Sequence, residues 1–468
     1  LHLPMLTDLA RLVKLGDAHW NPWIHGGQPL ITNPHYAAFY PPTWLTFVLP
    51  VDYAIGLLVF LHAVWAFVGA WKLTARWGAG AHGASLAALA FVGGGAFVSS
   101  PNLLNLFMGL AWLPWAVSWG EQTMVAESGR DWISAGVKTA LALAAQILAG
   151  SPVTPILSLL TLACLSLDLL PQKARPVLRL VPIGLTSLGL AAVQLLPTLR
   201  HISELPRGSG MKLTMATTWS TPPIRLVEWL WPRIFGDPML AESLLYFGYP
   251  GVERPIPLIL YIYCGALILA LAIGGLTARD LPRRRTLLAM ILGGIFLALG
   301  RYNPVYSSLL VEIPPFSLIR FPEKFILLST SGIAIAAGLA WHKLISNRAA
   351  DATRRARRVS ILIASVVLAV TIGLYFVPAV APDLMVELLE GTSADRVQWF
   401  DDSDGAATMP EDTLRARAGF LGRETFFSAL FWLGALIVLG LATNPRMPSV
   451  LLVFLAFGLT SIELAYYS

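Results

Sequence analysis

The sequence predicts an all-α, polytopic membrane protein of about twelve transmembrane helices, with its elaborated loops on one side of the bilayer. Three observations carry this prediction. Charged residues make up only 13% and hydrophobic residues 56% of the 468-residue chain, whereas a soluble domain is about 25% charged. Apolar segments of roughly span length recur from end to end. Lys and Arg are concentrated between alternate pairs of these segments. The formal charge of +6 therefore belongs to cytoplasmic loops and not to a nucleic-acid surface.

Residues 1–42 precede the first apolar segment and form an extracytoplasmic first loop. The chain begins at Leu1 without the features of a signal peptide and ends directly after an apolar segment, so we expect a fragment truncated at both ends. The stretch HWNPWIHGGQPLITNPHYAAFYPP (19–42) is too rich in Pro and Gly to cross a bilayer as a helix. Its many aromatic rings suit the membrane interface.

Two uses of this loop remain open. It anchors the first helix as an aromatic belt, or it forms the wall of a site for a lipid phosphate or a sugar. The second use follows because aromatic rings stack on sugars, while amide and imidazole groups bond hydroxyls. On that interpretation the substrate-binding candidates are Trp23, His25, Gln28, Asn33, His35 and Tyr40.

Two carboxylates, Asp8 and Asp17, precede the first apolar segment. A sugar transfer needs a general base near the acceptor hydroxyl, so Asp8 is the candidate catalytic residue. The alternative is that both are solvated residues of a short amphipathic helix. The histidines His19, His25 and His35 match no zinc spacing and lack a CxxC or HExxH partner. We therefore predict no metal site and no cofactor, although a divalent metal would be compatible with the chemistry.

Twelve apolar segments divide the chain into three membrane blocks. Six segments fall within 43–199, four within 256–380 and two within 425–468. The extracytoplasmic loops 200–255, 301–324 and 382–424 lie between or within these blocks. We expect the triple glycine Gly93–Gly95 to mark close helix packing. The individual segments are 43–71, 84–99, 103–119, 132–149, 153–170, 180–199, 256–276, 286–300, 325–341, 359–380, 425–443 and 448–467.

Basic residues set the orientation. With residues 1–42 outside, the inner loops contain 17 Lys and Arg in 63 residues and the outer segments 15 in 171. This threefold difference in density agrees with the positive-inside rule. The irregular Pro- and aromatic-rich stretches then all fall on the outer face, where we expect binding or chemistry. The inner loops are 72–83, 120–131, 171–179, 277–285, 342–358 and 444–447.

Some basic residues run against this bias and lie in outer loops. Arg301, Arg320 and Lys324 flank a Pro-rich stretch, and Arg200 and Arg207 follow a span. Because Arg presents a planar donor fork to phosphate, such a cluster suits a lipid phosphate or pyrophosphate at the bilayer edge. The alternatives are contact with phospholipid head groups or an ion pair, for instance with the neighbouring Glu323.

Other stretches favour structural interpretations. The spacing of Trp and Leu in TTWSTPPIRLVEWLWPRIFGDP (217–238) predicts a helix in the membrane interface. We predict that the acidic DDSD (401–404) is a solvated turn, since it fits no calcium-loop pattern. Cys164 and Cys264 lie in apolar runs and read as small buried hydrophobic residues. Motifs for ATP-driven transport and common soluble hydrolases are absent from the sequence.

The opening stretch resembles the first-loop signature of the YfhO-like bacterial membrane proteins, roughly W-N-P-x(4)-G-x-P-L-x-x-N/D-P-Q-x(3)-F-Y-P-P. His35 stands where these proteins commonly have Gln. The segment LAGSPVTPILSLL is similar to the family's L-x-G-H-P-Q segment, with Ser151 and Val153 in place of His and Gln. Further segments follow in the expected order, so the resemblance covers nearly the whole chain. The matching residues are Trp20, Asn21, Pro22, Gly27, Pro29, Leu30, Asn33, Pro34, Phe39, Tyr40, Pro41 and Pro42.

The YfhO-like family is similar in build to the GT-C glycosyltransferases. The resemblance implies a multispan enzyme of the bacterial cytoplasmic membrane. Such an enzyme moves a sugar, with inversion, from a polyprenyl-phosphate donor to a cell-envelope polymer, lipid or protein on the outer face. In that superfamily the acidic residue of the first outer loop is a base or metal ligand, which here would lie upstream of Leu1. The alternatives are a lipid or polysaccharide transporter or flippase and a non-catalytic membrane assembly protein.

Overall fold

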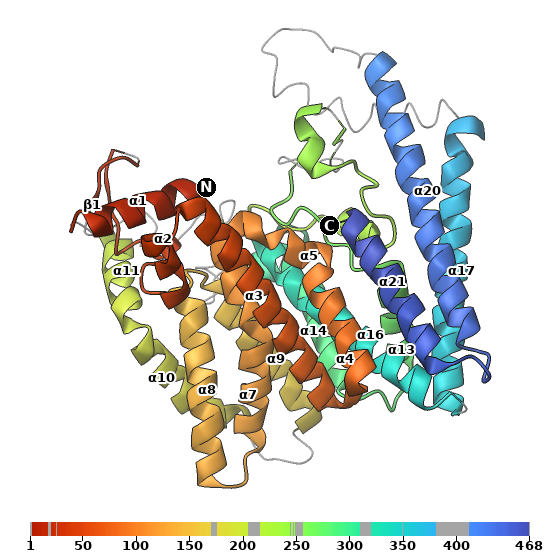
Figure 1. The fold of residues 1–468 in the computed structure, drawn as a ribbon, viewed down its shortest axis with the longest axis horizontal. Coiled ribbons are helices and arrows are strands. Elements are labelled where there is room, and N and C mark those ends of the chain that lie inside the picture. Colours follow the sequence, from red (N-terminus) through yellow and green to blue (C-terminus); the bar gives the residue numbers. More distant parts are fainter. Residues whose placement is uncertain are drawn as a thin grey trace.

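The computed structural model describes residues 2–16, 20–24, 26–169, 176–204, 216–243, 245–246, 248, 256–308, 320–348, 350–380 and 411–467. The all-α prediction is confirmed, since the described chain is a helical bundle with a single two-residue antiparallel ladder (Figure 1). The strands are β1 (Trp20–Asn21) and β2 (Gln28–Pro29). The α-helices are α1 (His2–Lys14), α2 (Leu45–Val48), α3 (Val51–Thr74), α4 (Gly80–Gly93), α5 (Gly95–Val98), α6 (Leu104–Ala111), α7 (Leu113–Val125), α8 (Gly129–Leu148), α9 (Val153–Leu169), α10 (Val181–Leu190), α11 (Ala192–Glu204), α13 (Ala266–Thr277), α14 (Arg284–Ala298), α15 (Pro304–Ser308), α16 (Ile326–Ser346), α17 (Asp351–Val380), α20 (Glu411–Leu441) and α21 (Ser449–Tyr467).

Short helical turns connect these helices at several points. All are 3-10 turns except η3, which has π geometry and reverses the chain between α3 and α4. Gly78 (φ +101°) and Gly80 (φ +58°) permit this reversal. The short turns are η1 (Pro34–Tyr36), η2 (Pro41–Trp44), η3 (Ala75–Ala79), η4 (Ser100–Leu103), η5 (Pro176–Leu180), η7 (Pro223–Trp229), η8 (Pro238–Ser243), η9 (Gly300–Tyr302) and η12 (Pro322–Phe325).

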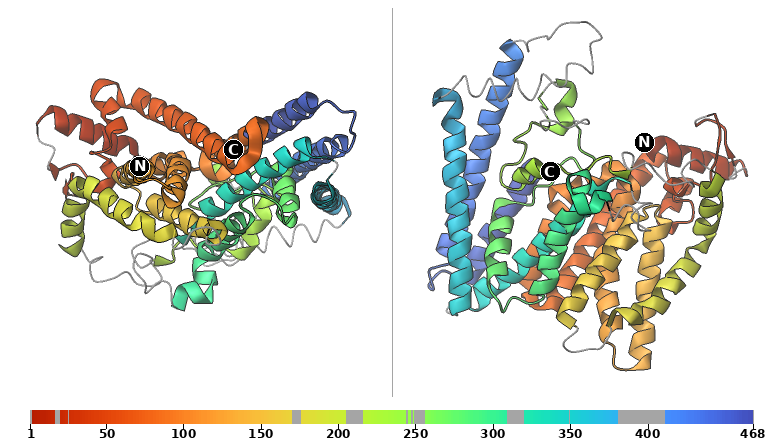
Figure 2. Two further views of the ribbon diagram at one scale, coloured as in Figure 1. Left: turned by 90° about the horizontal axis from the view of Figure 1, so that it is seen from below. Right: turned by 180° about the vertical axis from the view of Figure 1, so that it is seen from behind.

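Every predicted apolar segment contains one or more helices, although the segment 256–276 is helical only from Ala266. By length and composition, six helical stretches among the described residues can cross a membrane, or seven if the bent pair Val177–Leu190 and Ala192–His201 is one span. This establishes an integral, multi-pass membrane protein, and the count of twelve remains a prediction. The helices form an elongated bundle, with α8, α10 and α11 at one end and α17 and α20 at the other (Figures 1 and 2).

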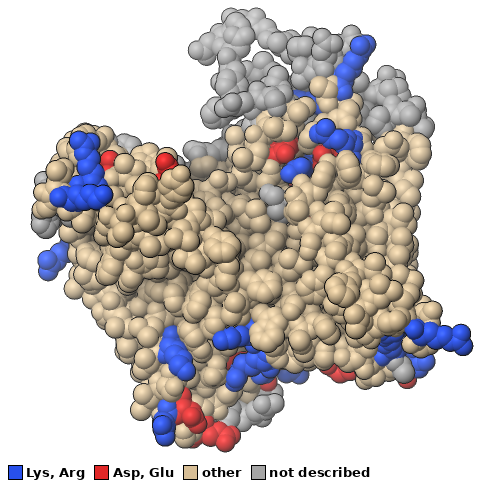
Figure 3. All heavy atoms as spheres, viewed as in Figure 1, with Lys and Arg blue, Asp and Glu red and all other residues tan. Residues whose placement is uncertain are grey.

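The predicted inner loops meet on one face of the bundle, which we call the basic face. The carboxylate of Glu121 accepts from Arg76 Nε (3.1 Å), Trp77 Nε1 (3.0 Å) and Arg283 Nη2 (2.5 Å). These contacts bring the loops 72–83, 120–131 and 277–285 together. The opposite face carries α1, the β1–β2 ladder and the ends of α14 and α16, and we call it the loop face. Charged residues gather toward these two edges, with an uncharged belt between them (Figure 3).

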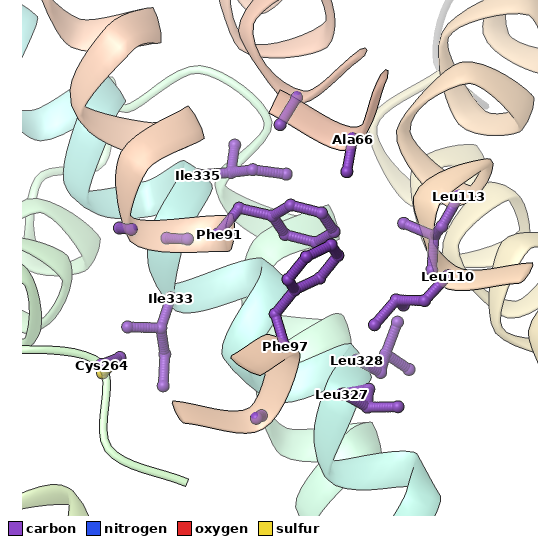
Figure 4. Packing of buried hydrophobic residues seen from close by; sticks show 14 of the residues in the cluster. Ala66, Phe91, Phe97, Leu110, Leu113, Cys264, Leu327, Leu328, Ile333 and Ile335 are labelled. Carbon is purple, nitrogen blue, oxygen red and sulfur yellow. The ribbon is translucent and has the colours of Figure 1, made fainter. Parts of the chain in front are cut away.

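The core is a dense apolar cluster centred on α4, α5, α6 and α16. The rings of Phe91 and Phe97 lie 5.3 Å apart, centroid to centroid, among Leu110, Leu327 and their neighbours (Figure 4). Helices approach closely at small residues, as the Gly-rich segment predicts. A Cβ on Gly93 would lie 2.9 Å from Leu464 Cδ1 of α21, so the predicted close helix packing is confirmed there. Gly95 instead approaches the non-helical Tyr261, with 2.7 Å between its Cβ position and Tyr261 Cβ.

Two predicted helices are wrong. The predicted span 256–276 becomes helical only at Ala266, after Gly265 (φ +103°). The preceding residues are non-helical and pair with the α5 region, where Gly95 N donates to Tyr263 O (2.7 Å) and Tyr261 N to Ser99 Oγ (2.9 Å). The predicted interfacial helix 217–238 is instead the 3-10 turn η7 flanked by other turns. The adjacent prolines at 222 and 223 oppose a continuous helix.

Candidate functional site

The opening loop is held as a compact hairpin on the loop face. Trp20 pairs with Pro29 and Asn21 with Gln28 across the β1–β2 ladder. Gly27 has φ +110°, and a Cβ there would lie 2.6 Å from the Trp20 ring. Glycine is required at that position for both reasons. The loop therefore has the rigidity that its Pro- and Gly-rich sequence indicates.

A hydrogen-bond network joins this hairpin to α1. The side-chain Nδ2 of the fully buried Asn21 donates to Asp8 Oδ2 (2.8 Å) and to the Tyr36 hydroxyl (2.8 Å). Gln28 Nε2 donates to the same hydroxyl (3.0 Å). Asp8 lies on the amphipathic helix α1, as one prediction had it, and it is only partly exposed. The network thus brings two predicted site residues, Asp8 and Gln28, to one surface.

Trp23 belongs to the same surface. Its side chain is 48% exposed, and the guanidinium of Arg11 lies 4.4 Å from its ring centroid. Its backbone N–H donates to Asn21 Oδ1 (2.9 Å), which fixes the residue to the network. An exposed indole on a rigid support can stack on a ligand ring.

The other predicted residues of this loop have different positions. Asn33 caps η1 by accepting from His35 N (3.0 Å), and the His35 side chain is exposed. Tyr40 is buried, and its hydroxyl bonds His62 Nε2 (2.7 Å) and accepts from Trp112 Nε1 (2.7 Å). Burial raises the pKa of Tyr40 above its ordinary range, so the phenol stays protonated. These contacts fasten the loop to α3 and leave Tyr40 away from the surface. His25 lies outside the described residues.

The predicted cations meet at the loop-face ends of α14 and α16. The guanidinium of Arg320 and the ammonium of Lys324 lie over the Phe321 ring, 4.8 and 5.0 Å from its centroid. The exposed Arg301 follows Gly300, where a Cβ would lie 2.7 Å from Pro322 Cγ. We call Arg301, Arg320 and Lys324 the cation cluster. Arg200 is exposed on α11, and Arg207 lies outside the described residues.

A buried ion network supports this cluster, and sequence reasoning missed it. Arg225 is 1% exposed, with Nε 3.2 Å from Glu228 Oε2 and with Nη1 donating to Glu323. Glu323 also accepts from the backbone N–H groups of Leu258 (3.0 Å) and Ile259 (3.1 Å). Glu323 is therefore paired with Arg225, and not with Arg320 as one alternative from the sequence had it. The sequence did contain a signal for this pair, because Arg225 and Glu228 are spaced i, i+3 within an apolar, Trp-rich stretch. Charges in such a stretch are expected to be buried, and buried charges need partners.

A second polar cluster on the same face was also missed. Arg233 lies 5.3 Å from the Tyr261 ring centroid and its Nε is 3.5 Å from Asp237 Oδ2. The Tyr261 hydroxyl donates to Asp237 Oδ1 (2.5 Å), and burial together with that carboxylate raises the pKa of Tyr261. Deeper in the bundle, the fully buried Glu463 accepts from the Tyr263 hydroxyl and from Ala266 N (2.9 Å).

The described part of the chain places no three His, Cys, Asp or Glu side chains where they could hold a metal ion. Its two cysteines are free: Cys264 is buried, as predicted, and Cys164 is half-buried.

Comparison with solved structures shows that this chain shares its fold with known membrane proteins of determined structure. Two crystal structures of ArnT from Cupriavidus metallidurans have this fold. The one bound to undecaprenyl phosphate is 14% identical, with a TM-score of 0.51 over 99% of this chain and 72% of that chain. The apo structure is 15% identical, with a TM-score of 0.53 over 100% of this chain and 72% of that chain. No protein-family model and no curated protein sequence matches this chain.

Proposed function

We propose that the protein is a GT-C glycosyltransferase that uses a polyprenyl-phosphate-linked sugar. The observation that carries the proposal is the cation cluster at the loop-face ends of α14 and α16. The shared fold supports it, since one ArnT structure is bound to undecaprenyl phosphate. The acceptor would be a polymer, lipid or protein of the bacterial cell envelope. The loop face would lie outside the cytoplasmic membrane, as the positive-inside rule predicts.

The cation cluster suits the charge that a sugar transfer develops. As the bond between the sugar and the donor phosphate breaks, the leaving phosphate gains negative charge, which guanidinium and ammonium groups stabilise. Arg320 and Lys324 stand on either side of Glu323 in sequence, yet the Glu323 carboxylate is turned to Arg225 and two backbone amides. This arrangement keeps an acidic neighbour from occupying the place of the donor.

The opening loop would form the pocket wall. Trp23 would stack on a sugar, and Gln28, Asn33 and His35 would bond hydroxyls. Asp8 would be a general base that takes the proton of the acceptor hydroxyl as that oxygen attacks the sugar, with the polyprenyl phosphate as leaving group. The loop's spacing also supports assignment to the YfhO-like family. If Asp8 is the base, Asp8→Asn lowers transfer about 100-fold or more with little effect on folding, because the amide oxygen still accepts from Asn21.

A lipid or polysaccharide transporter is the second candidate. Two observations favour it: the 75° bend between Val177–Leu190 and Ala192–His201, and the fully buried carboxylate of Glu463 in an apolar helix. Broken helices and intramembrane charges are features of transporter sites. The glycosyltransferase is preferred because the shared fold is that of a glycosyltransferase.

Proteoliposomes containing the full-length protein and a radiolabelled polyprenyl-phosphate sugar test the proposal. Each of Arg320→Ala and Lys324→Ala should lower transfer about 10- to 100-fold, since a hydrogen bond to a charged group contributes about 1.5–3 kcal/mol. Arg446→Ala removes an exposed charge on the basic face and should leave transfer unchanged. Absence of transfer to every envelope acceptor would contradict the proposal, and so would transfer that Arg320→Ala leaves unchanged. Movement of the intact labelled lipid across the bilayer would instead favour the transporter.

A further inference from the structure

A cavity lies at the basic face, far along α16 from the cation cluster. It is partly open, with about 310 Å³ of empty space when the solvent at its mouth is counted, and it is lined by α13, α16 and the first turns of α17. We call it the basic-face cavity. Apolar side chains form most of its wall, and a few polar groups converge on it. Among its lining residues are Leu271, Leu344, Lys343, Thr353, Arg357 and Ser360.

The packing of α13 explains why space remains there. At Gly274 a Cβ would lie 2.0 Å from Ser360 Oγ, and at Gly275 it would lie 2.5 Å from Ala340 Cβ. The helix therefore touches both α17 and α16 at these glycines. It ends at Thr277, and Ala278 is already extended, so α16 and α17 continue toward the basic face without a helix between them.

The polar groups of this cavity are two cations and a hydroxyl. Lys343 pairs with the exposed side chain of Asp280. In the described part of the chain, Arg357 donates one long hydrogen bond, from Nη1 to Ala442 O (3.3 Å). The hydroxyl of Thr353 is buried, with the residue 2% exposed, and it has no hydrogen-bond partner among the residues that the structure describes. A buried hydroxyl without a partner is costly, and a ligand atom in the cavity would satisfy it.

The electrostatic surroundings favour an anion. Arg348, Arg354 and Arg358 all act on Arg357 through their like charges. Nearby negative charge comes from Asp280 and from Asp351, and each of these already pairs with a cation. Thr353 is the third residue of α17, whose first backbone N–H groups add positive potential. An anion beside Thr353 and Arg357 would reduce the repulsion among the arginines.

We propose that the basic-face cavity binds the phosphate group of an anionic phospholipid. Lys343, Thr353 and Arg357 would hold the phosphate, and the acyl chains would follow the apolar wall past Leu271 and Leu344. Basic pockets between membrane helices on the cytoplasmic side are suited to such lipids. A free phosphate would use the same three groups but leave the apolar wall without a partner. The site is independent of the proposed transferase activity.

Lipid binding to the full chain in nanodiscs tests this proposal. Phosphatidylglycerol should bind about tenfold more tightly than phosphatidylcholine, measured by native mass spectrometry and by thermal stabilisation. Arg357→Gln should weaken phosphatidylglycerol about three- to tenfold, and Thr353→Val should weaken it without lowering stability in phosphatidylcholine alone. Arg446→Gln removes an exposed charge of the same face, outside the cavity, and should change nothing.

Three results would overturn the proposal. Equal binding of the two lipids, or equal effects of Arg357→Gln and Arg446→Gln, would show that the cavity does not select a phosphate anion. Inorganic phosphate that displaces phosphatidylglycerol, with its own binding weakened by Arg357→Gln, would assign the site to a free phosphate. Arg357→Lys keeps the charge and should retain most of the lipid preference, which separates lost binding from misfolding.

Discussion

The buried pair of Arg225 and Glu323 gives the sharpest test of how the loop face is held together. Glu323→Gln removes the charge while nearly preserving the shape of the side chain. The carboxylate accepts from Arg225 and from two backbone N–H groups, those of Leu258 and Ile259. The amide of glutamine has one acceptor oxygen, and its NH2 group would face a donor. Arg225 would keep Glu228 and the carbonyl of Ile259.

The expected cost follows from these contacts. One charge-assisted bond to Arg225 contributes about 1.5–3 kcal/mol, and a buried N–H left without a partner costs about 1–3 kcal/mol. Together they predict a loss of about 3–5 kcal/mol in the free energy of unfolding, the range found when one member of a buried ion pair is removed. Glu228→Gln removes the charge from the 3.2 Å contact to Arg225, and a weakened bond of that kind is expected to cost about 1–2 kcal/mol.

The measurement is a reversible denaturant titration in mixed micelles, followed by far-UV circular dichroism. Asp52→Asn, an exposed carboxylate in the first turn of α3, is the control and should cost less than about 1 kcal/mol. In the double variant with Arg225→Gln, the cost should be well below the sum of the two single costs, because the partners interact. If Glu323→Gln is no more destabilising than Asp52→Asn, the buried network does not hold the loop face.

Three further predictions concern the opening loop and the orientation. Gly150 has φ +84°, and a Cβ there would lie 2.1 Å from Pro34 O. In the same titration, Gly150→Ala should therefore lower the free energy of unfolding by at least about 2 kcal/mol. The control Gly184→Ala, where a Cβ would meet nothing within 4 Å, should not lower it. Tyr40→Phe leaves the Trp112 N–H without its acceptor and should cost about 1–3 kcal/mol; an unchanged titration midpoint would argue against the fastening role. His35→Cys and Arg446→Cys should lie on opposite sides of the membrane. A membrane-impermeant maleimide should label His35→Cys in intact cells and Arg446→Cys only after permeabilisation. The reverse labelling pattern would show that the orientation is inverted.

Helices and their sorting onto two faces could be predicted because each depends on local composition. A bilayer demands long apolar runs with satisfied backbone bonds, and basic loops mark one side. The segment 256–265 shows where this reasoning fails. Its residues are as apolar as a span, but the backbone bonds to Gly95 and Ser99 in place of its own helix. Hydropathy predicts that a segment is buried, but it does not predict which groups its backbone amides bond.

The cation cluster shows a similar limit at the site. Arg320 and Lys324 stood out in sequence because they oppose the positive-inside bias, and the structure places them over one ring, that of Phe321. From the sequence alone, the neighbouring Glu323 was one of several alternative partners for these cations. The orientation of Glu323 depends instead on Arg225, almost a hundred residues earlier in the chain, and on two amides of a non-helical segment.

Under the proposed function, a long-range ion pair of this kind also affects what the cation cluster can bind. Were Glu323 to face Arg320 and Lys324, it would offset their charge and repel an anionic donor. Because burial with Arg225 turns it inward, the stability of the loop face and its affinity for an anion become linked through one carboxylate. Glu323→Gln should therefore disturb folding first, and any loss of donor binding should scale with the fraction of protein that remains folded. Arg320→Ala, by contrast, should lower binding at unchanged stability.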